Sequence, residues 1–99
     1  MFDPNYNFTC VDRFLKYVKY DTQSDEDSPT FPSSEKQKIL SAALAEELKQ
    51  MGLSDAHMDQ WGYVMATLPS NTEKDVPPIA FIAHVDTSPA VSGANVNPI

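Results

Sequence analysis

The sequence predicts a mixed α/β fold in which two helices precede three strands. Apolar residues recur at helical spacing in the first half of the chain, whereas the second half contains short runs rich in β-branched and aromatic residues. The last of these runs, Ile79–Val85, is apolar at successive positions, which is typical of a central strand buried on both faces.

The first helix is indicated by an apolar stripe through residues 11–18, which is formed by Val11, Phe14, Leu15 and Val18. Thr9 is a suitable N-cap, and Asp12 places a negative charge in the first turn, where the helix dipole favours it. Residues 20–33 follow with two prolines and many small polar side chains, and we expect them to form an exposed, mobile linker.

The second helix is indicated by signals at both of its ends. Ser34 and Gln37 have the spacing of a capping box, and Gly52 is a natural left-handed residue beyond the helix end. Between them runs one apolar stripe, made by Leu40, Ala43, Leu44, Leu48 and Met51.

Three strands are expected after Gly52. Residues 55–59 predict a short strand, residues 60–62 a turn and residues 63–68 a second strand. A polar loop with three prolines occupies residues 69–78, and residues 79–85 form the third strand.

The two helices can cover one face of such a sheet, but nothing in the chain covers the other face. Because a strand that is apolar on both faces needs a layer on each side, we expect the chain to be a piece of a larger α/β domain.

The composition excludes several classes of function. The 99 residues include 14 acidic and 7 basic side chains, a formal charge of −7, which argues against binding to nucleic acid or to an anionic membrane surface. No apolar run approaches the roughly 20 residues that span a bilayer, and the first residues lack the features of a signal peptide. With a single cysteine, the sequence is that expected of a soluble cytoplasmic protein.

The most informative residues for function are His84 and Asp86, at the carboxyl end of the third predicted strand, where open α/β sheets place their chemistry. A neutral imidazole is a good zinc ligand, and a nearby carboxylate can fix its tautomer and orientation. One histidine cannot hold a catalytic zinc ion, because such a site takes three protein ligands. A His-x-Asp pair alone is also compatible with a purely structural, hydrogen-bonded histidine.

A family resemblance adds to this interpretation. The run Ala83–Pro89, with Ser92-Gly93 and Asn95–Pro98 after it, closely resembles the first metal-ligand segment of the peptidase T family, the zinc-dependent tripeptide aminopeptidases of the bacterial cytoplasm. Four further segments are similar to the amino-terminal region of that family: Arg13–Val18, Asp21–Ser24, Met51–Leu53 and Val64–Pro69. One departure from the family is Ala90, which stands where we expect an acidic residue. This difference puts a local polar contact in doubt, but not the metal ligand.

The resemblance implies that residues 1–99 are the amino-terminal portion of a three-layer α/β/α catalytic domain, without the rest of that domain or its lid domain. It implies that His84 is a ligand of one of two zinc ions and that Asp86 is the catalytic-site carboxylate that orients its ring. The parent enzyme would release the amino-terminal residue of tripeptides with a zinc-activated water, and this chain alone is expected to be inactive.

Two alternatives stay open. One is a related di-zinc carboxypeptidase or deacylase, and the other is a non-catalytic interaction module that pairs through exposed strand edges. The expected partners are a short peptide substrate and, through the uncovered apolar face, further copies of the chain.

Overall fold

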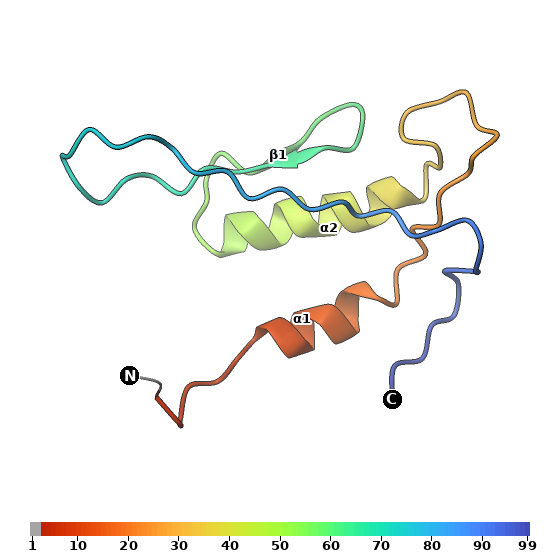
Figure 1. The fold of residues 1–99 in the computed structure, drawn as a ribbon, viewed down its shortest axis with the longest axis horizontal. Helices are drawn as coiled ribbons and strands as arrows, with labels where there is room; N and C mark the ends of the chain where they lie inside the picture. Colours follow the sequence, from red (N-terminus) through yellow and green to blue (C-terminus); the bar gives the residue numbers. More distant parts are fainter. Residues whose placement is uncertain (1–2) are drawn as a thin grey trace.

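Residues 3–99 are described in a computed structural model, which contains two helices and one two-stranded antiparallel sheet. The elements follow in the order α1 (Cys10–Tyr17), α2 (Gln37–Gln50), β1 (His57–Met58) and β2 (Val64–Met65). In Figure 1, α2 lies between the β1–β2 hairpin and α1. The mixed α/β class that the sequence predicts is therefore confirmed, whereas a three-layer domain is not formed by the described residues.

Helix α1 begins after Thr9, as predicted, with Asp12 in its first turn and Lys16 in its last. The Thr9 side chain makes no capping bond, and its hydroxyl accepts from Arg13 Nη1 instead. Its apolar stripe is present but uncovered: no residue of α1 is buried, and Val11 and Phe14 are 57% and 62% exposed. The expectation that both helices cover a sheet is therefore wrong for α1. Within residues 3–99, α2 packs against both strands of the hairpin, and α1 has no comparable contact with them.

Polar contacts to Glu47 of α2 hold α1 in place. Its Oε1 accepts from Arg13 Nε at 2.6 Å, and its Oε2 accepts from Lys16 Nζ at 3.1 Å and from Tyr17 Oη at 2.8 Å. The Arg13 hydrogen bond, followed by that of Tyr17, lowers the pKa of Glu47 from 4.5 to about 2. One carboxylate of α2 thus joins the two helices through three hydrogen bonds.

Helix α2 starts later than the predicted capping box. The helix begins at Gln37 after Lys36, and the Gln37 Nε2 donates to Ser33 Oγ at 3.2 Å. The side chain of Ser34 makes no capping bond, since the cap position lies two residues beyond it. At the other end, Gly52 has the left-handed φ of +96° that the sequence predicts.

The hairpin follows its predicted positions in shortened form. His57 pairs with Met65 and Met58 with Val64, in antiparallel register. The turn is fixed by Asp59, whose Oδ1 accepts the backbone N–H groups of Trp61 and Tyr63, each at 2.9 Å. This Asx-type bonding explains why residues 60–62 turn the chain where the pattern indicated.

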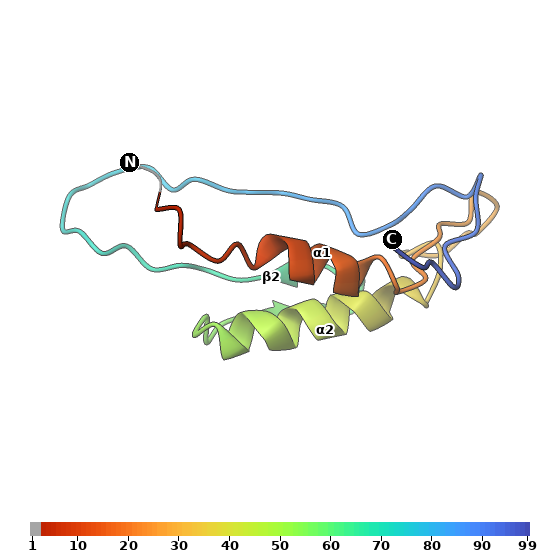
Figure 2. The same ribbon diagram turned by 90° about the horizontal axis from the view of Figure 1, so that it is seen from below.

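The predicted strand at residues 79–85 does not form, which corrects the three-strand expectation. Ile79, Phe81 and Ile82 are 83%, 97% and 94% exposed, and no strand among residues 3–99 pairs with them. Figures 1 and 2 show this segment as the returning half of a long extended loop that runs out beyond the hairpin. A strand needs a neighbouring backbone to complete its hydrogen bonds, and the described chain supplies none here.

The fold is open for its mass. Its radius of gyration is 16.4 Å, against about 13 Å for a compact domain of this length. Its accessible surface is 8353 Å², against roughly 5,600 Å² for a compact protein of 11.0 kDa. The buried apolar residues in the described range are few: Leu40, Ala45 and Ala56. Neither helix of the described range has the length and apolar character that crossing a bilayer requires.

Candidate functional site

His84 and Asp86 contact each other at the end of the extended segment. The His84 Nδ1 lies 2.9 Å from the backbone oxygen of Asp86 and 3.1 Å from its Oδ1. Both oxygens are acceptors when the carboxyl group is ionised, so the partners assign the ring proton to Nδ1. In the neutral ring, Nε2 then carries the free lone pair, which is the atom that a metal ion would bind.

The pair is accessible from solvent. The side chain of His84 is 84% exposed and that of Asp86 is 46% exposed. Residues 3–99 contain no group of three or more His, Cys, Asp and Glu side chains arranged to hold a metal ion. The donor set therefore fits one metal ligand and its orienting carboxylate, and further ligands would have to come from outside the described chain.

The chain just after this pair is anchored to residues 22–24. The backbone N–H of Thr87 donates to the Thr22 carbonyl at 3.1 Å, and the Thr87 carbonyl accepts from the Ser24 N–H at 2.9 Å. The Ser24 hydroxyl also donates to the Thr87 carbonyl at 2.9 Å. Gln23 and Thr87 thus form a parallel bridge immediately beyond Asp86.

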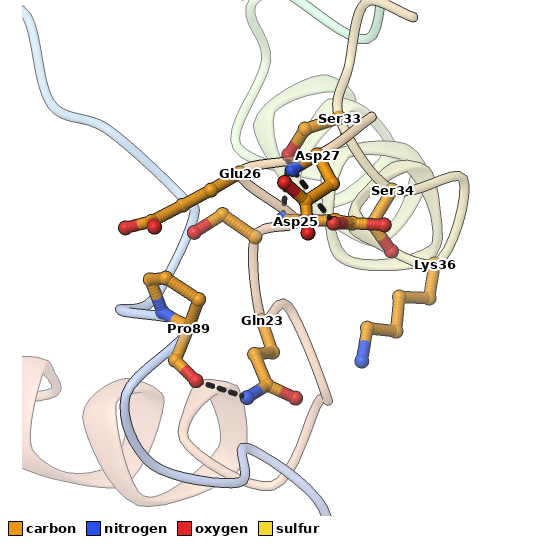
Figure 3. A pocket seen from close by; sticks show the side chains of 9 residues that line it. Gln23, Asp25, Glu26, Asp27, Ser33, Ser34, Lys36 and Pro89 are labelled. Carbon is orange, nitrogen blue, oxygen red and sulfur yellow. Dashed lines mark hydrogen bonds between the residues drawn. The ribbon is translucent and has the colours of Figure 1, made fainter. Parts of the chain in front are cut away.

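The side chain of Gln23 extends this anchor. Its Nε2 donates to the carbonyl oxygens of Pro89 at 2.9 Å and Val91 at 3.2 Å, and the bond to Pro89 is drawn in Figure 3. Asp21 also holds Gln23, because the Asp21 Oδ1 accepts the Gln23 backbone N–H at 3.1 Å. We call these contacts together, the bonds of Thr22 and Ser24 to Thr87 and those of the Gln23 side chain to Pro89 and Val91, the Gln23 anchor.

Asp21 is itself held by charge. Lys36 Nζ donates to its Oδ2 at 2.9 Å, and this bond, followed by the Gln23 N–H, lowers the pKa of Asp21. Gly93 passes so close that a β-carbon there would lie 2.9 Å from Asp21 Oδ1. The return of the chain after the His84–Asp86 pair is therefore packed closely on residues 21–23.

The anchor corrects one expectation from the sequence. The sequence predicts an exposed linker at residues 20–33, but Thr22 is only 2% exposed and its carbonyl accepts the N–H of Thr87 from the returning chain. The acidic run Asp25–Asp27 does lie at the surface, where it lines an open hollow of about 470 Å³ beside Pro89 (Figure 3). The local pattern gave no sign of the anchor, and only the family resemblance of Asp21–Ser24 pointed to that segment.

The other reactive side chains lie elsewhere. His57 is exposed on β1, where its Nδ1 lies 2.9 Å from the Asp55 carbonyl oxygen. Cys10 is a free, exposed thiol at the start of α1. The structure thus brings His84 and Asp86 together and leaves these two residues outside the site.

Comparison with curated proteins confirms the resemblance to peptidase T. The chain is 61% identical to the peptidase T of Clostridium acetobutylicum, 58% identical to that of Halothermothrix orenii and 59% identical to that of Bacillus subtilis. Each match extends over 88 residues, which is 89% of this chain and 22% of the relative. The chain therefore spans about a fifth of the length of the curated relatives it matches. No family model matches the chain.

Proposed function

We propose that this chain is part of a peptidase T-like enzyme, a zinc-dependent aminopeptidase that releases the amino-terminal residue of tripeptides. The observation that carries the proposal is the identity of 61% over 88 residues to a protein of that name. The hydrogen-bonded His84–Asp86 pair supports the proposal, because an imidazole whose orientation is fixed by a carboxylate is suited to bind a metal ion.

In this proposal His84 binds one of two zinc ions through Nε2, and Asp86 keeps the ring in the tautomer that leaves Nε2 free. When bound, zinc supplies a Lewis acid that polarises a peptide carbonyl and lowers the pKa of a bound water. The remaining ligands and the general base are not assigned to residues of this chain, so the 99 residues alone should be inactive.

A chimaeric enzyme tests the proposal. Residues 1–99 would replace the aligned segment of the Bacillus subtilis peptidase T, and tripeptide cleavage and zinc content would be measured. We expect an active chimaera, near-complete loss of activity and lower zinc content in His84→Ala, and a loss of about 10–100-fold in Asp86→Ala.

His57→Ala is the matched control, since it removes the other histidine of the chain from an exposed strand. It should leave both cleavage and zinc content unchanged. Full activity of the His84→Ala chimaera would refute the zinc assignment. Release of the carboxyl-terminal residue instead would favour the related carboxypeptidase chemistry.

The proposal also includes location and partners. A short peptide is the proposed substrate, and the free thiol of Cys10 fits the reducing cytoplasm in which we place the protein. The uncovered residues 79–85 leave the isolated chain with an exposed apolar segment and a free backbone edge, which favours self-association.

A further inference from the structure

We propose that Gln23 is a positioning residue for the His84–Asp86 pair, acting through the chain that follows the pair. The inference rests on the proposed function only in the role given to His84. It concerns how the fold holds the pair, and this can be measured without metal or substrate.

The geometry supports the inference because the pair has few other supports. The segment before His84 is exposed and unpaired, so it cannot fix the direction of the ring. Within the described chain, both hydrogen bonds of the His84 ring go to Asp86, so the direction of the ring depends on where Asp86 lies. The first fixed point is Thr87, which the backbone of residues 22–24 holds directly beyond Asp86.

The Gln23 side chain holds the residues that follow Thr87 as well. One amide group donates to two carbonyl oxygens, of Pro89 and Val91, and so ties the turn after Thr87 to the same loop that holds Thr87 itself. The contribution depends on donation: a carboxylate of the same shape has no hydrogen to give and would face two carbonyl oxygens.

Two variants separate donation from packing. Gln23→Glu keeps the size of the side chain and removes the donor, whereas Gln23→Ala removes the side chain. Gln50→Ala is the matched control, because Gln50 is an exposed residue at the end of α2. Far-UV circular dichroism of each variant establishes that the helices are retained.

The first measurement is amide hydrogen exchange in the zinc-free 99-residue chain. Both Gln23 variants should speed exchange at the Thr87 N–H about tenfold, which corresponds to a loss of about 1.4 kcal/mol of local stability. The second measurement is the ¹⁵N spectrum of the imidazole rings, which distinguishes the tautomer with its proton on Nδ1 from the one with its proton on Nε2. Both variants should lower the fraction of His84 with its proton on Nδ1, and His57 should not change.

Two outcomes would contradict a positioning role for Gln23. A Gln23→Glu chain with wild-type exchange and wild-type ring signals would overturn the proposal, because donation would then be irrelevant. Faster exchange at Thr87 with an unchanged His84 ring would also overturn it, since Gln23 would then support only its own loop. Neither measurement reads peptidase activity, so an inactive chimaera would count against the proposed function alone.

Discussion

Replacing Glu47 with glutamine should weaken the contact between the two helices. It should also reduce the fall in the free energy of unfolding that the chain undergoes at acid pH. Glu47 accepts three hydrogen bonds from α1, and its side chain is only 16% exposed. Glutamine fills nearly the same volume but carries no charge, so Glu47→Gln tests the electrostatic part of this contact.

The magnitude follows from the shift in pKa. A change from 4.5 to about 2 would correspond to roughly 3 kcal/mol if all of it stabilised the folded state. Arg13 and Lys16 are 35% and 54% exposed, so solvent screens the cluster, and we expect about 1–2 kcal/mol.

The sign of the pH effect is fixed by the direction of the shift. Because the pKa of Glu47 is lower in the folded state, its stabilisation is fully present above about pH 4.5 and is lost as the pH falls towards about 2. The free energy of unfolding of the wild-type chain should therefore fall through this window by more than that of Glu47→Gln.

Urea denaturation, followed by circular dichroism at a series of pH values, measures this difference directly. Glu46→Gln is the matched control, because Glu46 is the neighbouring residue on the same helix and its carboxylate is exposed. If Glu47→Gln and the wild-type chain lose stability in parallel between about pH 4.5 and 2, the cluster does not join the helices as described.

Three further predictions concern the turns, the metal and the exposed segment. Gly62→Ala and Gly52→Ala should each lower the urea midpoint by the equivalent of about 1–2 kcal/mol, because both glycines have left-handed φ angles. The loss should be larger at Gly62, where a β-carbon meets a side-chain atom at 3.3 Å, and equal losses would contradict this packing. Calorimetry should show zinc binding to the 99-residue chain no tighter than about −8 kcal/mol, and tight stoichiometric binding would mean that the chain completes a site alone. Light scattering should show that the wild-type chain self-associates and that Phe81→Ser weakens the association. Phe31→Ser is the control, because Phe31 is exposed outside residues 79–85, and it should have no effect. A monomeric wild-type chain would refute the role of residues 79–85.

The features that the sequence predicted correctly depend on neighbours a few residues away. Gly52 ends α2 because glycine adopts a φ of +96° at little cost. The turn at residues 60–62 forms because Asp59 bonds to backbone groups two and four residues further along. In each case the cause lies within the same short stretch of chain as its effect.

The capping box failed within that same range, because a competing contact replaced it. Gln37 bonds to Ser33 rather than forming a reciprocal cap with Ser34, and the helix begins at Gln37. Two adjacent serines offer similar chemistry, so spacing alone did not distinguish them.

The features that the sequence did not predict depend on distant parts of the chain. The apolar character of residues 79–85 predicts a strand only if a second strand lies beside it, and the described residues supply none. Thr22 and Gln23 form hydrogen bonds with Thr87 and Pro89, which lie more than 60 positions away. Local periodicity does not indicate such distant contacts. The spacing of His84 and Asp86, in contrast, did predict that they lie close together.

The Gln23 anchor also sets the order in which the chain can fold. Its hydrogen bonds join residues 63 to 68 positions apart, and closing a loop of that length costs roughly 4 kcal/mol of chain entropy. Helix α2 and the hairpin need only contacts between near neighbours, so we expect them to form within microseconds. The His84–Asp86 pair takes its place only after the long loop has closed. Substitutions in the anchor should therefore speed the release of the pair while leaving the early steps of folding at their wild-type rates.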